Sequence, residues 1–242
     1  MPDVWSALQA RKRANPGAPL VTYLAAKSGE RVELSGVSVE NAAAKIANAL
    51  RGEYDLDHGS TVDLRLPLHW QRTAWLAGVW TAGCIVLLGD QQADLAVLDQ
   101  NTVVSAAPKA REVLAVSLHP FGLPISATLP GGVVDATFAV RNQPDAYLFD
   151  PPTATMTAAT INGVARTQAD LWDNASDLAR EWGVSEGARV LIRGDLDTLD
   201  ALTACLVLPL WCAGSVVLAA GDIDVDQVVD TERVTAIGAP RP

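Results

Sequence analysis

The sequence predicts an α/β protein with two similar lobes, each with a mostly parallel sheet flanked by helices. Strand-like and helix-like apolar patterns alternate along the chain, which is typical of parallel sheets. The second half of the chain also repeats several short motifs of the first half in the same order. The 242 residues are 49% hydrophobic and 19% charged, so the chain can bury a sizeable core.

The first half of the chain contains most of the expected elements. They are a helix over 4–13, strands over 20–24 and 31–34, a helix over 39–50, a strand over 62–66, a helix over 69–82, and strands over 84–88, 96–98, 103–105 and 113–117. Ser38 is a candidate N-cap for the helix over 39–50, and Gly83 ends the helix over 69–82. The strand, helix, strand order predicts parallel pairing.

Beyond a loop over 120–132, rich in Pro and Gly, the pattern begins again. The matched motifs are Leu34-Ser-Gly36-Val with Ile161-Asn-Gly163-Val, Gly59-x-x-Val62 with Gly187-x-x-Val190, Trp80-Thr-Ala-Gly83 with Trp211-Cys-Ala-Gly214, and Gly89-Asp90 with Gly221-Asp222. Two copies are too few for a solenoid. We therefore predict a first lobe over 1–125, a connector over 126–144 and a second lobe over 145–242, with a ligand site where the lobes meet.

Charge and hydropathy limit the partners. The formal net charge of −10 disfavours nucleic acid, because most of the surface would repel phosphate. No apolar run reaches the roughly 18–20 residues of a membrane span, and the first residues do not resemble a signal peptide. We expect a cytoplasmic protein without a membrane partner.

Cysteine and tryptophan both fit a packed core. Cys84, Cys205 and Cys212 lie in apolar stretches without metal-ligand spacing, which predicts reduced, buried thiols. Most of the tryptophans fall on expected helices, where core packing is favoured over a ligand-stacking box. These tryptophans are Trp70, Trp75, Trp80, Trp172, Trp182 and Trp211.

The two repeat units together resemble the first two subdomains of the adenylate-forming superfamily, which includes acyl-CoA synthetases, luciferases and nonribosomal-peptide adenylation domains. The matching segments are Gly29–Leu34, Ala47–Leu50, Leu66–Leu68, Trp80–Gly83, Gly163–Val164, Asn174–Ala175, Gly183–Val190, Leu208–Gly221 and Val234–Pro240. More narrowly, the chain resembles a small actinobacterial family of uncharacterised proteins distantly similar to those enzymes.

The resemblance implies a phosphate loop, and the sequence departs from it there. Members of the superfamily carry a Ser/Thr/Gly-rich loop that ends in Gly-x-Pro-Lys just before the pair corresponding to Gly163-Val164. Residues 153–162 offer hydroxyl groups but neither glycine nor lysine. A phosphate cradle needs closely approaching backbone N–H groups and a compensating cation.

Two interpretations of this stretch remain open. The alternation of Thr153, Thr155 and Thr157 with apolar residues favours a strand with one hydroxyl-bearing face. A residual anion site would use Thr155, Thr157, Thr160 and Asn162, which are the weak candidates for cofactor binding. Asn162 stands where the resemblance implies the lysine, and it is uncharged.

The resemblance stops at residues 240–242, where members of the superfamily continue into motifs for adenine, ribose and magnesium and then into a C-terminal domain. We identify no catalytic residue and no metal ligand. The expected function is a degenerate, non-catalytic binding or regulatory module, a pseudoenzyme whose partner is another protein or a small ligand between the lobes. ATP and AMP are disfavoured as cofactors, and the alternative is an enzyme of the AMP-dependent ligase type that retains nucleotide or acyl-ligand binding.

Carboxylates after the strand at 190–193 allow two interpretations. Asp195, Asp197 and Asp200 would meet a ligand at the carboxyl edge of a sheet, or Asp197 would cap a helix.

The remaining polar clusters favour structural roles. The run from Asp222 to Asp226 lacks the glycine and glutamate of a calcium loop and predicts an acidic turn that opens a helix. His58, His69 and His119 show no ligand spacing, so we expect surface or loop positions for them.

Overall fold

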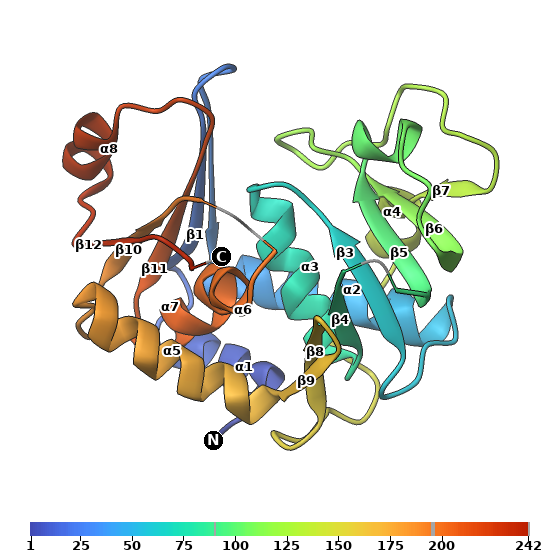
Figure 1. Ribbon diagram of the computed structural model, residues 1–242, viewed down its shortest axis with the longest axis horizontal. Helices are drawn as coiled ribbons and strands as arrows, with labels where there is room; N and C mark the ends of the chain where they lie inside the picture. The colour runs from blue at the N-terminus through green and yellow to red at the C-terminus, as the bar shows by residue number, and fades with distance from the viewer. Residues whose placement is uncertain (90, 195–196, 242) are drawn as a thin grey trace.

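The computed structural model describes residues 1–89, 91–194 and 197–241 and contains two mostly parallel sheets with helices packed on them (Figure 1). The strands are β1 (Pro19–Ala25), β2 (Glu30–Ser35), β3 (Thr61–Arg65), β4 (Ile85–Leu88), β5 (Ala93–Asp99), β6 (Ala110–Val116), β7 (Val133–Asp135), β8 (Thr157–Ile161), β9 (Val164–Thr167), β10 (Arg189–Ile192), β11 (Ser215–Ala220) and β12 (Ala236–Gly238). This architecture confirms the predicted fold class.

The helical elements surround and separate the sheets (Figure 1). They are α1 (Val4–Ala14), α2 (Gly36–Gly52), α3 (Trp70–Thr81), the 3₁₀-helix η1 (Thr102–Val104), α4 (Ala136–Arg141), α5 (Gln168–Trp182), α6 (Leu199–Leu202), the π-helical segment η2 (Thr203–Val207), α7 (Leu208–Trp211) and α8 (Val225–Glu232). No helix in the described part of the chain is long and apolar enough to cross a membrane.

Five consecutive strands of the larger sheet repeat the strand order of the smaller sheet, and each sheet takes a hairpin from the other half of the chain. The five-stranded sheet has the order β12-β10-β11-β1-β2, and the seven-stranded sheet has the order β7-β6-β5-β3-β4-β8-β9. Among the described residues, this hairpin is the only antiparallel pair in each sheet. Its first strand pairs in parallel with the strand beside it, β1 with β11 and β8 with β4.

This exchange means that the sheets do not divide the chain at residues 125 and 145. The hairpin over 19–35 lies in the sheet whose other strands span 189–238, and the predicted connector over 126–144 contains β7 and α4. The order of the motifs along the chain predicts contiguous lobes. It does not predict the exchange of hairpins, because strand pairing depends on contacts between residues far apart in the sequence.

One continuous core lies between the sheets and includes the inner faces of both. Helix α3 lies between the two sheets and packs closely on α2, because Gly78 leaves room for Ile46 (Figure 1). A Cβ at position 78 would lie 2.4 Å from Ile46 Cγ2. Trp80, on α3, is fully buried, and its Nε1 donates a hydrogen bond to the Ala158 carbonyl at 2.8 Å.

Two local predictions are wrong. Helix α2 starts at Gly36 with Ser35 as N-cap, because the Ser35 hydroxyl accepts the N–H of Ser38 and takes the role predicted for Ser38 itself. Residues 103–105 do not form a strand. They overlap η1, where Asp99 accepts the N–H of Thr102 and tightens the chain into a 3₁₀ turn.

Candidate functional site

The candidate site is a group of mostly buried polar side chains between the carboxyl edge of the five-stranded sheet and the start of α3. Open α/β sheets place their ligands outside the carboxyl ends of the strands. Tyr23 of β1 lies against the ring of His69, with 4.4 Å between ring centroids, and Glu30 opens β2 on the same side. We call the group formed by Tyr23, Glu30, His69 and the nearby Leu118 and His119 the inter-sheet crevice.

His69 reaches the crevice because it caps α3. Its Nδ1 accepts the backbone N–H of Gln71 at 3.2 Å, so a neutral ring carries its proton on Nε2. The residue is 2% exposed, and Nε2 has no hydrogen-bond partner among the described residues. The nearest carboxylate atom is Glu30 Oε1 at 3.8 Å, which is also buried without a hydrogen-bond partner.

Burial controls the protonation of these groups. It lowers the pKa of His69 to about 4, although the charge of Asp99 and then the Leu118 carbonyl act in the opposite direction. Burial also raises the pKa of Glu30, against the influence of His119, and burial together with Glu30 raises the pKa of Tyr23. At neutral pH the crevice therefore presents a neutral imidazole N–H donor beside a desolvated carboxyl group.

A second hollow, of about 350 Å³, lies at the ends of β3 and β4 beside Asp197. Asp63 and Arg65 form an ion pair at 2.6 Å on its wall. Arg72, on α3, is 1% exposed, donates to the Leu66 carbonyl and lies 3.9 Å from Asp197. The charged groups here are engaged by protein partners, which favours a structural role for this hollow.

The threonine candidates occupy a hairpin instead of a loop. Thr157 and Thr160 lie on β8, as the strand interpretation predicts, whereas Thr155 is exposed in the preceding turn and bonds the hydroxyl of Thr153 at 3.1 Å. Asn162 is exposed in the turn between β8 and β9. The four candidates therefore follow the hairpin in sequence and do not converge on one point.

The Asn162–Gly163 turn is as short as a hairpin connection can be. Both residues have positive φ, 50° for Asn162 and 80° for Gly163, which is the conformation of a type I′ turn and suits an Asn-Gly pair. The strands on either side pair as far as Ile161 and Val164. No backbone remains between β8 and β9 to curve around an anion.

The carboxylates after β10 are only partly as predicted. Thr198 caps α6 by accepting the N–H of Ala201, so the prediction of an Asp197 cap is wrong. Asp200 is 6% exposed and binds Arg241 at 2.8 Å. Burial opposes ionisation of Asp200, but its hydrogen bond from Arg241 holds the pKa below its usual range. Asp195 lies outside the described residues, as does Asp90 of the matched motifs.

The other polar predictions fare differently. Asp224 accepts the N–H of Gln227 and caps α8, which confirms the acidic turn that opens a helix. His58 and His119 are at least partly exposed. His69 lies in the loop directly before α3, as expected, but it is buried, so a surface position is wrong for this residue. The described residues contain no group of three or more His, Cys, Asp or Glu able to hold a metal ion.

The predictions for cysteine and tryptophan largely hold. All three cysteines are free and buried. Trp75, Trp80 and Trp172 belong to the core, but Trp211 is 42% exposed because it lies on the outer side of the short helix α7. Trp211 matches Trp80 in the order of the repeated motifs, but that match does not determine whether its side chain faces the core or the solvent.

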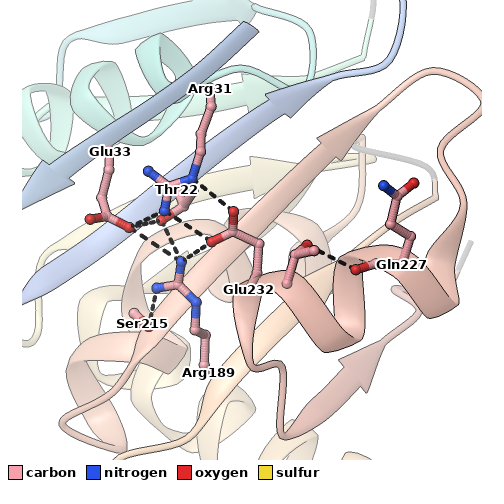
Figure 2. Close-up of polar contacts among 8 residues, drawn as sticks. Thr22, Arg31, Glu33, Arg189, Ser215, Gln227 and Glu232 are labelled. Atoms are coloured by element: carbon pink, nitrogen blue, oxygen red, sulfur yellow. Dashed lines mark hydrogen bonds and ion pairs between the residues drawn. The ribbon is translucent and has the colours of Figure 1, made fainter. Parts of the chain in front are cut away.

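A cluster of paired charges fixes α8 to the face of the five-stranded sheet that points away from the continuous core (Figure 2). Its members are Thr22, Arg31, Glu33, Arg189, Ser215 and Glu232. Glu232 accepts from Arg31 and from Arg189, each at 2.7 Å, and these hydrogen bonds lower the pKa of Glu232. Because each carboxylate has a cation partner, the cluster stabilises the fold and leaves no charge for a ligand.

Sequence reasoning missed Glu30 and Tyr23 as site residues. A histidine directly before a helix, at the carboxyl end of a predicted strand, was the one available signal for the crevice. The partner residues come from β1 and β2, which approach His69 only through the exchange of hairpins between the sheets.

Comparison with known proteins shows the family of this chain. No family model matches it. A protein of Mycobacterium tuberculosis (strain ATCC 25618 / H37Rv) described as a TIGR03089 family protein is 35% identical over 234 residues, which cover 93% of each chain. The chain belongs to the TIGR03089 family.

Solved structures share the fold of this TIGR03089 family member. They include an acyl-CoA synthetase from Brucella canis (TM-score 0.81, 15% identity, 98% of this chain and 47% of that chain). Acetoacetyl-CoA synthetase from Streptomyces lividans gives a TM-score of 0.78 at 12% identity, over 98% of this chain and 42% of that one. The anthranilate CoA ligase AuaEII, solved with anthranoyl-AMP, gives 0.72 at 14% identity, over 94% and 46%.

These likenesses confirm the fold expected from the resemblance, that of the N-terminal subdomains of adenylate-forming enzymes. The chain spans less than half the length of those three solved structures. Fold alone does not fix function.

Proposed function

We propose that this protein is a non-catalytic relative of adenylate-forming enzymes, a pseudoenzyme that binds a small ligand or a protein partner and forms no acyl-adenylate. The observation that carries the proposal is the two-residue turn at Asn162–Gly163. A triphosphate requires several converging backbone N–H groups and a cation, since catalysis of phosphoryl chemistry is largely positioning and charge neutralisation. A tight hairpin whose two turn residues are exposed offers neither.

The threonine hydroxyls do not replace the missing groups. Thr153 and Thr155 bond each other, and Thr157 and Thr160 lie within the paired part of β8. Neutral hydroxyl groups balance none of the charge on a triphosphate, and losing one preorganised donor typically costs about 3–4 kcal/mol of barrier.

The inter-sheet crevice supports the binding part of the proposal. His69 Nε2 and Glu30 Oε1 are buried without hydrogen-bond partners among the described residues. Each unsatisfied buried group costs about 1–3 kcal/mol. A small polar ligand that reached both atoms with one acceptor and one donor would recover that free energy, which supports a small polar ligand as the partner.

Pyrophosphate exchange tests the proposal against its alternative. The purified protein, ATP, Mg²⁺ and a panel of carboxylic acids should give no exchange of labelled pyrophosphate into ATP above a no-protein blank. Exchange that falls in Thr155→Ala and Thr157→Ala, and not in the control Thr128→Ala on an exposed loop, would support the alternative of an AMP-dependent ligase.

The exposed hydroxyl pair of Thr153 and Thr155 is the observation that favours this alternative, in which the hydroxyls contact phosphate.

We also propose that residues 1–125 and 145–242 are two copies of one repeated unit joined through 126–144, supported by the matching strand orders of the two sheets. We also propose a cytoplasmic location, and the negative net charge supports the absence of a nucleic-acid partner.

A further inference from the structure

A cavity of about 320 Å³ lies on the side of α3 that faces the seven-stranded sheet. It is formed by α2, α3, α4 and the segment over 121–123, and the phosphate-loop hairpin contributes nothing to it. Its volume is at the lower end of the range for small-molecule sites. The cavity is separate from the inter-sheet crevice, because no crevice residue lines it.

The walls of this cavity are apolar and aromatic. Trp70 and Trp75 of α3 line one side, Ile46 of α2 and Val140 of α4 line others, and Phe121 lies at the mouth with 84% of its surface exposed. Aromatic side chains favour flat ligands that stack on them or meet their edges.

Two polar groups at this cavity lack protein partners among the described residues. Trp70 Nε1 is buried and makes no hydrogen bond, and a buried tryptophan N–H normally has an acceptor. Arg141 is exposed at the last turn of α4, lines the cavity and forms no ion pair in the described ranges. Lys45, by contrast, is held by Asp145 at 3.0 Å and is not available to a ligand.

We propose that this cavity binds an aromatic anion. The ring system packs against Trp70 and Trp75, an acceptor atom of the ligand receives a hydrogen bond from the Trp70 Nε1–H group, and the anionic group pairs with Arg141 at the mouth. Arginine suits this role because its planar guanidinium both stacks on rings and binds oxyanions through two N–H groups. The site is independent of nucleotide binding and of the inter-sheet crevice.

The probe for the test is 8-anilinonaphthalene-1-sulfonate, an aromatic ring system with one anionic group. Titration of the full chain should give one saturable enhancement of probe emission. Arg141→Gln should weaken binding roughly tenfold, as expected for loss of a charge-assisted contact. The matched control, Arg13→Gln, changes another exposed arginine that does not line the cavity and should leave binding unchanged.

A second variant fills the cavity. Ala74→Leu places a larger side chain on the α3 wall and should abolish saturable binding while circular dichroism shows a folded protein. Should Ala74→Leu fail to fold, the exposed Arg141→Gln change decides alone. Saturable binding that both Arg variants leave equal, or enhancement that never saturates, would overturn the proposal.

Discussion

Replacing His69 tests the physical basis of the inter-sheet crevice. Asn is the chosen substitute because it is a good N-cap and keeps an acceptor for the Gln71 N–H. In the unfolded chain a histidine titrates near its ordinary value of 6.5, whereas burial holds the folded pKa at about 4. The unfolded state therefore binds more protons than the folded state between these values.

The sign and size of the effect follow by linkage. Because the unfolded state is favoured by protonation, His69 lowers the stability of the wild-type protein as pH falls from 7 towards 4. A shift of this size corresponds to about 3 kcal/mol at 1.36 kcal/mol per pKa unit. Relative to wild type, His69→Asn should thus gain about 3 kcal/mol in free energy of unfolding between pH 7 and pH 4.

Urea unfolding at pH 4, 5.5 and 7 measures this difference directly. Glu30 contributes with the opposite sign, since its raised pKa costs stability as pH rises through its titration, so both proteins should also be compared in a Glu30→Gln background. His58→Asn, which changes a partly exposed histidine outside the inter-sheet crevice, is the control. Equal pH slopes for wild type and His69→Asn would refute the reasoning.

Two further substitutions test how buried polar groups contribute to stability. Trp80→Phe leaves a buried carbonyl unpaired and should cost about 1–3 kcal/mol in urea unfolding beyond the loss of ring area, whereas Trp70→Phe removes an N–H that has no partner and should cost clearly less. Equal losses would contradict this view of Trp70. Glu232→Gln removes the charge that both arginines share and should cost about 1.5–3 kcal/mol at neutral pH. That loss should disappear in acid, where Glu232 is protonated in both states, and a pH-independent loss would argue against an electrostatic role.

Local patterns predicted much of the fold because they depend on neighbours in sequence. The helix α3, the buried strand after Gly83 and the core position of Trp80 each follow from periodicity and end signals within one element. The absence of a phosphate cradle was also predictable, because residues 153–162 contain neither glycine nor lysine.

The site itself was less predictable because it depends on long-range pairing. Glu30 meets His69 only because the first hairpin joins the sheet of the second half. The burial of His69 and its lowered pKa follow from that packing, not from the residues beside it in sequence. The cavity at Trp70 likewise needs α4, which lies in a region predicted to be a connector.

Calorimetric titration with ATP in the presence of Mg²⁺, and then with AMP, tests the central claim most directly. The account predicts no saturable heat at ligand concentrations up to the order of 1 mM, where binding would be worth only about 4 kcal/mol. Micromolar binding of ATP that is lost on changing Thr155 or Asn162 would show that this hairpin does hold a triphosphate, and would contradict the account.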